Sequence, residues 1–331
     1  MQCTTESRAQ FWDSRKPGPQ DDWLDDAQLV IKLPVISTIW SSDPKPSDKD
    51  ASILLVTSTG DPMDNSDSKL HPQPLNISLT LLERLVETSQ LSSPYTRTVL
   101  ATRGFHMSHH LQYGAADGKP SGVTVLFRFP RNSSSITCVL RLRLADYACV
   151  CLLFCRDDQV LHDLRRRFTE EASLLRRNPL HILTFVFAHR KETFDKWLKE
   201  IAYDVSEAET ASGMVPLTWK RSQLRPGRLS HLQDLDKPNL LSHLFSTHTR
   251  LCHSELVAQY GIKFGKFCLE VVDMVERYRT AAGFPETRLV DRSDWEEAIR
   301  FTLGRWELVQ DKVSELLQRL RGQCDVAHSP A

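Results

Sequence analysis

The chain has 331 residues, with 42 basic and 42 acidic side chains, and 40% of its residues are hydrophobic. The length suggests about two domains, and the hydrophobic content is typical of a globular protein. The charge balance gives no support to a nucleic-acid partner or a polybasic membrane anchor, because each needs a net positive patch. No apolar run approaches the roughly 20 residues that a membrane helix needs, so we expect no membrane span.

The amino-terminal residues, 1–26, are polar and charged throughout and lack the apolar core of a secretory signal. We expect them to form a disordered tail. Eight cysteines are scattered along the chain, most of them among apolar neighbours. Without an export signal, they are expected to be reduced, buried thiols of a cytoplasmic protein.

Residues 27–160 are predicted to form an α/β region. The segment Leu29–Trp40 is rich in β-branched residues, although Pro34 favours an edge strand. Ser52–Ser58 is a short apolar run typical of a buried strand, and Leu75–Ser89 has the apolar spacing of a helix.

The clearest strand pattern lies in the second half of this region. Apolar residues alternate along Ile136–Leu144, which indicates a strand with one buried face. Ala148–Cys155 is apolar throughout, as expected of a strand buried on both faces. Together with Gly122–Pro130, these segments predict a three-stranded meander.

Residues 161–322 are predicted to form a domain of long helices, followed by a disordered tail at 323–331. The first helix starts at Asn178 and Pro179 and ends at Gly213, and its apolar residues from Leu180 to Val205 are predicted to fall on one stripe. The second runs from near Pro238 to Gly283, with Pro285 just beyond. The fold class is therefore α+β: a mainly β amino-terminal region, then long antiparallel helices.

A third helix is expected to open at Ser293, because Glu296 completes a capping box three residues later. Its apolar residues alternate by three and four, as in a short coiled-coil seam. This stripe, called the α-stripe below, consists of Trp306, Val309, Val313, Leu316 and Leu320. Two interpretations stay open: the α-stripe is an exposed surface for self-association or a protein partner, or it completes the intramolecular core.

Three histidines, His243, His248 and His253, follow one another at intervals of five residues on the second helix. Five residues turn a helix by about 140° beyond a full circle, so the three side chains are predicted to point in different directions. Metal-binding histidines on one helix sit four residues apart. Cys252 precedes His253 directly and points about 100° away from it. We therefore expect no metal site among these residues.

Other candidate sites are weak as well. His106, His109 and His110 form a dense cluster, and if the segment is helical His106 and His110 share a face, but no acidic third ligand follows at a recognised spacing. The three cysteines of the apolar strand, Cys149, Cys151 and Cys155, lack the second pair of a zinc pattern.

The acidic segment Asp61–Asp67 lacks the spacing of a calcium loop, and Asp21–Asp26 is expected to attract divalent cations only weakly. Gly261 and Gly265, four residues apart, are predicted to allow close helix crossing. No catalytic, cofactor-binding or metal-binding residue is assigned.

Three stretches of the helical half resemble fungal proteins related to the CorA-type magnesium transporters. They are Arg176–Met214, with its "PLHIL" opening, Leu240–Glu276, with Thr249 and the "FGKF" segment, and Trp306–Gln323. The resemblance extends over about Arg165–Gln323. It implies the soluble α/β and stalk parts of such a protein.

The transporters of this family continue into two membrane helices with a Gly-Met-Asn signature. This chain has Gly213, Met214 and Val215 instead, and stops at Ala331 before any such helix. The resemblance therefore gives no pore residue, and we expect no transport activity.

Three functions stay open from the sequence. The first is a non-enzymatic, cytoplasmic interaction or regulatory protein that works through its C-terminal helix, by self-association or with a protein partner. The second is an enzyme or accessory protein of fungal metabolism, with a pocket that gathers His106, His109 or His110 and a carboxylate. The third is a regulatory domain that responds to Mg²⁺, the one cofactor left open, through acidic residues at a subunit interface.

Overall fold

The computed structural model describes residues 9–13, 23–24, 32, 53–59, 77–91, 94–101, 104–114, 118–129, 135–211, 237–285 and 289–328. The chain divides into two compact units, each described here by itself. The sheet unit comprises Met1–Val186 and Phe267–Ile299, and the helical unit comprises Phe187–Lys266 and Arg300–Ala331. Strands occupy the amino-terminal half and long helices follow, so the fold is α+β as predicted.

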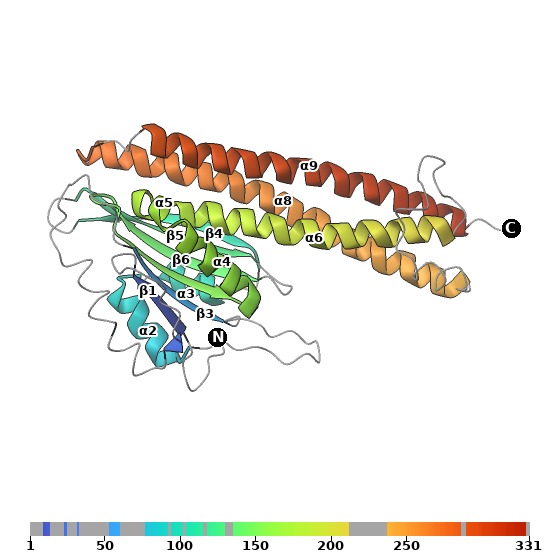
Figure 1. Ribbon diagram of the computed structural model, residues 1–331, viewed down its shortest axis with the longest axis horizontal. Helices are drawn as coiled ribbons and strands as arrows, with labels where there is room; N and C mark the ends of the chain where they lie inside the picture. The colour runs from blue at the N-terminus through green and yellow to red at the C-terminus, as the bar shows by residue number, and fades with distance from the viewer. Residues whose placement is uncertain are drawn as a thin grey trace. The chain divides into compact units, whose positions relative to one another are not determined.

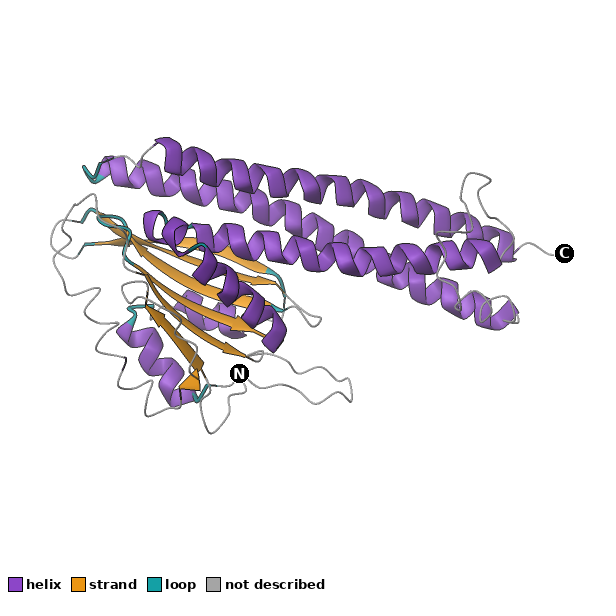
Figure 2. Ribbon diagram, viewed as in Figure 1, coloured by secondary structure: helices purple, strands orange, loops and turns teal. Residues whose placement is uncertain are grey.

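The described strands of the sheet unit form one seven-stranded mixed sheet (Figure 2). They are β1 (Ala9–Asp13), β2 (Trp23–Leu24), β3 (Ile53–Thr59), β4 (His106–Tyr113), β5 (Pro120–Phe129), β6 (Ile136–Arg143) and β7 (Cys149–Cys155), in the order β2-β1-β3-β7-β6-β5-β4. Neighbours pair antiparallel except β3 and β7, which are parallel. The predicted meander is confirmed as β5, β6 and β7, and β4 extends it by one strand.

Helices cover both faces of this sheet (Figure 1). On one face, α2 (Leu79–Thr88) and α3 (Pro94–Ala101) bury leucines and valines against β3, β5, β6 and β7. The Ser78 side chain caps α2 by accepting a hydrogen bond from the backbone N–H of Leu81. On the other face lies α4 (Asp158–Glu170), followed by the short α5 (Ala172–Arg177). Every residue of β7 is buried, as its unbroken apolar sequence predicts.

The helical unit is built from parts of α6 (His181–Ala211), α8 (Lys237–Ala281) and α9 (Leu289–His328). The apolar stripe predicted on the first long helix is buried, from Phe187 through Phe194 to Val205. The Phe187 ring packs on Phe264 of α8 and stacks on Trp306 of α9, with ring centroids 5.5 and 6.4 Å apart. These aromatic rings form the centre of the unit's core.

Ion pairs fix how the three helices of this unit are aligned. Arg305 pairs with Asp195 at 2.9 Å and Arg319 with Glu209 at 2.5 Å, and both pairs join α9 to α6 across 110 residues of sequence. The constant separation means that α6 and α9 run parallel. Arg250 of α8 pairs with the buried Asp204 of α6. The Arg319–Glu209 pair is largely buried, so removing either partner would leave an uncompensated charge between α6 and α9.

Two glycines of α8 permit this close packing, as predicted. A Cβ atom on Gly261 would collide with the indole of Trp306, and one on Gly265 would lie 2.9 Å from Phe187 and 3.0 Å from Leu303. Gly304 and Gly322 of α9 differ, since a Cβ built on either meets no described atom within 4 Å.

Several predicted boundaries are wrong. The expected tail at residues 1–26 contains β1 and β2, because β1 pairs along its whole length with β3, a long-range contact that local polarity does not reveal. The tail expected at 323–331 is helical as far as His328, and α9 begins at Leu289 rather than at Ser293. Glu296 accepts a hydrogen bond from Arg292 within the helix, so the apparent capping box lies inside it.

The units also do not divide at the expected break between the regions 27–160 and 161–322, because α4, α5 and sections of all three long helices belong to the sheet unit. Apart from Lys32, the strand expected at Leu29–Trp40 lies outside the described residues. None of the described helices is both long and apolar enough to cross a membrane.

Candidate functional site

The clustered histidines lie on β4, at one end of the strand order, rather than on a helix. His106 and His110 occupy the sheet face that carries α3, where the His110 ring stacks on Tyr95 with centroids 3.9 Å apart. His109 points to the opposite face, where its ring stacks on Phe267 at 5.9 Å. Alternation along the strand therefore separates His109 from the other two.

The two histidines on the same face do not converge either. Four residues of strand separate them by about 13 Å, more than any single ion or reacting atom spans. His106 hydrogen-bonds Ser108 at 2.8 Å. Burial lowers the pKa of both imidazoles, and that of His110 is lowered further by His109 and His106. Both therefore favour the neutral form at neutral pH, and no described contact brings a carboxylate to them.

The cysteines of the meander are fully buried. Cys138 and Cys151 on neighbouring strands place their sulfur atoms 3.5 Å apart. Burial raises the pKa of Cys138 and Cys149 well above the ordinary thiol value, and it also raises that of Cys155. Since the thiolate is the reactive and metal-binding form, these side chains act as small apolar residues of the sheet core.

The evenly spaced histidines of α8 point in different directions, as predicted. His253 lies against Trp197 of α6, with ring centroids 5.9 Å apart, and burial together with the charge of Arg190 lowers its pKa. Since five residues of α8 turn by about 140° beyond a full circle, His243 and His248 lie elsewhere around the helix. Within the described ranges, no group of three or more His, Cys, Asp or Glu side chains is placed to hold a metal ion.

One pair on this helix was not predicted from the sequence. His248 and Cys252 are four residues apart, and the Cys252 sulfur lies 3.7 Å from Nδ1 and 3.9 Å from Nε2 of His248. Both side chains are partly exposed. Cys252 was compared with its neighbour His253 and not with His248, although a spacing of four residues is the one that places two ligands on one helix face.

The α-stripe is buried inside the helical unit. Trp306, Val313, Leu316 and Leu320 have no exposed surface, and Val309 is 9% exposed. Of the two interpretations left open, the intramolecular core is the one that the structure shows. Burial of Val313 and Leu316 leaves no α-stripe surface for a partner.

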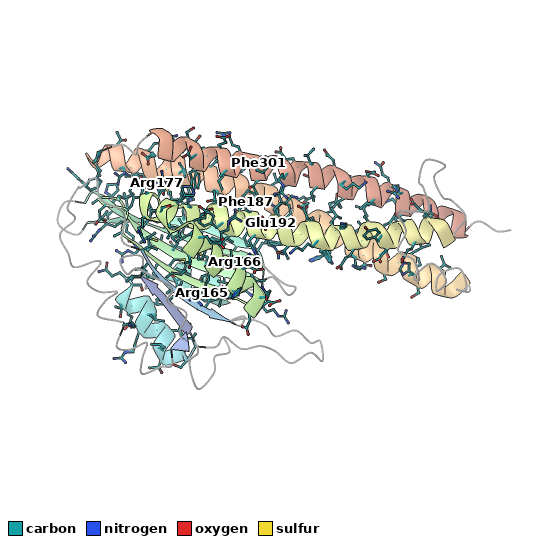
Figure 3. The ribbon with its side chains drawn as sticks, viewed as in Figure 1. Arg165, Arg166, Arg177, Phe187, Glu192 and Phe301 are labelled. Atoms are coloured by element: carbon teal, nitrogen blue, oxygen red, sulfur yellow. The ribbon has the colours of Figure 1, made fainter. Side chains whose placement is uncertain are left out.

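The opposite face of α9 carries apolar side chains that the core does not use. Phe301 and Leu308 are 67% and 70% exposed, and Gly304 lies between them. Phe301 is labelled on α9 in Figure 3, and the guanidinium of Arg305 lies 6.0 Å from its ring centroid. We call Phe301, Gly304 and Leu308 the outer face of α9. Exposed charges, Arg300 and Glu307, flank it on one side.

The segment Asp61–Asp67 and, apart from Trp23 and Leu24, the segment Asp21–Asp26 lie outside the described residues. No model of a known protein family matches the sequence, and no curated protein matches it. The resemblance to CorA-related proteins therefore stays a prediction that depends on the three quoted stretches.

Proposed function

We propose that this chain is a non-enzymatic protein-interaction module whose helical unit pairs with a second copy of itself through the outer face of α9. The proposal depends mainly on two large apolar side chains, Phe301 and Leu308, which stay exposed on a helix whose other side is fully packed. One exposed apolar residue is ordinary, whereas two on one helix face with a glycine between them provide a continuous surface.

The outer face is self-complementary in an antiparallel arrangement. Phe301 and Leu308 are equidistant from a point next to Gly304, so a two-fold axis there sets Phe301 of each copy against Leu308 of the other. Gly304 then lets the two helices approach closely. No described neighbour within the chain requires a glycine at this position, although glycine costs a helix about 1 kcal/mol relative to alanine.

The flanking charges support the same arrangement. Arg300 and Glu307 lie on one side of the outer face, and the midpoint between them falls within about one residue of the same axis. Along the helix axis, Arg300 of each copy is therefore offset from Glu307 of the other copy by only about 3 Å. Opposite charges at such positions select the pairing and its register more than they strengthen it.

The energy of this contact sets the expected affinity. Burying two phenylalanines and two leucines that are each about two-thirds exposed contributes roughly 4–8 kcal/mol. Association costs about 4–15 kcal/mol in lost freedom and side-chain ordering. We therefore expect a weak pair, which forms only as the protein concentration rises.

Sedimentation velocity without added metal, from low micromolar concentration upward, tests the proposal. The wild-type chain should shift from monomer towards dimer, and Phe301→Asp combined with Leu308→Asp should stay monomeric. Lys196→Ala with Lys199→Ala on the exposed side of α6 lowers the net charge by the same two units and should behave as wild type. A wild-type chain that stays monomeric at every concentration would contradict the proposal, and so would identical behaviour of all three proteins.

A further inference from the structure

The His248–Cys252 pair of α8 lies on a different helix from the outer face of α9 and plays no part in the proposed function. The two side chains come from one exposed stripe of α8, between Phe245 and Leu256, which are 54% and 52% exposed. An imidazole and a thiol are both good ligands for zinc. Neither side chain is needed for the core of the helical unit, since both are partly exposed.

The distance between these two ligand atoms matches tetrahedral zinc. With a zinc–sulfur bond of about 2.3 Å and a zinc–nitrogen bond of about 2.0–2.1 Å, a tetrahedral ion holds the two atoms about 3.6 Å apart. The Cys252 sulfur is 3.7 Å from Nδ1 of His248. The pair can therefore take up the ion with a small side-chain rotation and no change in the helix.

One chain supplies only two of the four ligands, as no third His, Cys, Asp or Glu joins them among the described side chains. A second copy of the same stripe supplies the other two. The midpoint between His248 and Cys252 is residue 250, so in an antiparallel pair His248 of each copy lies level with Cys252 of the other. Four ligand side chains then meet within about 3 Å of the two-fold axis, measured along the helices.

The apolar residues of the stripe fit the same axis. Phe245 and Leu256 are equidistant from a point between residues 250 and 251, less than one residue from the midpoint of the ligand pair. The arrangement that gathers the four ligands therefore also sets Phe245 of each copy beside Leu256 of the other. The metal ligands and the apolar contacts therefore favour the same two-fold arrangement. Nothing in the packing of a single chain requires their midpoints to coincide.

We propose that the helical unit binds Zn²⁺ between two copies of the chain, with His248 and Cys252 of each copy as the four ligands. Binding forms two zinc–sulfur and two zinc–nitrogen bonds, and each Cys252 releases its thiol proton to solvent. The site has no open position for a reacting group, so it is structural rather than catalytic. It makes pairing through α8 dependent on zinc.

The variant Phe301→Asp/Leu308→Asp isolates this pairing, because it removes the outer face of α9. Titrated with Zn²⁺, it should change from monomer to dimer by light scattering and bind one ion per two chains by elemental analysis. With Co²⁺ in place of zinc, it should show the absorption of a tetrahedral site with thiolate ligands. His248→Ala and Cys252→Ser should each weaken binding at least about tenfold and abolish the dimer, while His253→Ala should not.

Circular dichroism should show that each variant keeps its helices. Zinc should also slow alkylation of Cys252 in the wild-type chain, which reports on the ligand without any substitution. A monomer that stays monomeric in excess zinc would overturn the proposal, as would one ion per chain or binding unchanged by Cys252→Ser. These outcomes leave the α9 proposal intact, because that pairing is measured in the wild-type chain without metal.

Discussion

Gly261 of α8 gives the most sensitive test of packing in the helical unit. A Cβ atom there would come closer to three atoms of the Trp306 indole than real Cβ atoms approach their neighbours. The indole cannot rotate away, because it is fully buried and packed against Phe187 and Phe194, whose ring centroids lie 6.4 and 5.1 Å from it. In Gly261→Ala, either α8 or α9 must therefore shift.

Two terms of opposite sign determine the result of Gly261→Ala. Overpacking a well-filled core costs about 1–3 kcal/mol, and three close contacts with a rigid ring favour the upper part of that range. Replacing a helical glycine by alanine stabilises the folded state by about 1 kcal/mol. We expect the free energy of unfolding to fall by about 1–2 kcal/mol, which corresponds to a melting temperature a few degrees lower.

Gly322→Ala on α9 is the matched control, because its added methyl group meets no described atom within 4 Å. It should raise the free energy of unfolding by up to about 1 kcal/mol through helix propensity alone. Thermal unfolding followed by circular dichroism compares the two variants. If Gly261→Ala stabilises the protein as much as Gly322→Ala does, α8 and α9 do not approach each other at Gly261.

Four other predictions follow from the packing and exposure of other side chains. Val313→Asp buries an unpaired carboxylate and should lower the free energy of unfolding by more than about 4 kcal/mol. The urea unfolding transition of the helical unit should then be lost. Arg300→Glu and Glu307→Arg should each weaken wild-type dimerisation, and the two together should restore it in sedimentation velocity. Folding lowers the pKa of His253, so at pH values between this lowered pKa and about 6.5 the unfolded chain binds more protons than the folded chain. The free energy of unfolding should therefore fall as the pH drops through this window, and it should fall less steeply in His253→Gln. Finally, peptide mapping after brief alkylation of the native protein without metal should find Cys252 modified and the thiols of β6 and β7 unmodified.

The elements with strong periodicity were predictable from the sequence. The meander strands alternate or are apolar throughout, and the apolar stripe on α6 recurs at intervals of three, four or seven residues, so local pattern alone identifies them. The β1 and β4 strands were not recognised. The β1 strand is held by pairing with the distant β3, and β4 pairs with β5, the next strand along the chain. A polar segment such as β4, with three histidines, has no local signal that outweighs its composition.

The two surfaces proposed here were missed for a different reason. Periodicity identifies a repeated apolar stripe but not the side of the helix that the rest of the chain covers. On α9, the regular α-stripe is the covered side, and the shorter apolar set of Phe301 and Leu308 is the exposed one. Only the packing of α6 and α8 distinguishes them. On α8, neither the spacing of the histidines nor the adjacent Cys252–His253 pair points to the combination of His248 with Cys252.

A cysteine cross-link at Gly304 tests most directly whether the helical unit pairs through α9. In a background where Cys3, Cys252 and Cys324 are replaced by serine, Gly304→Cys should form a disulfide-linked dimer under mild oxidation, because the two-fold axis passes beside it. Gly322→Cys in the same background should not, since the two copies of residue 322 would lie roughly 50 Å apart along the helices. Equal cross-linking at both positions, or none at Gly304→Cys at concentrations where the wild type is dimeric, would contradict the proposed pairing.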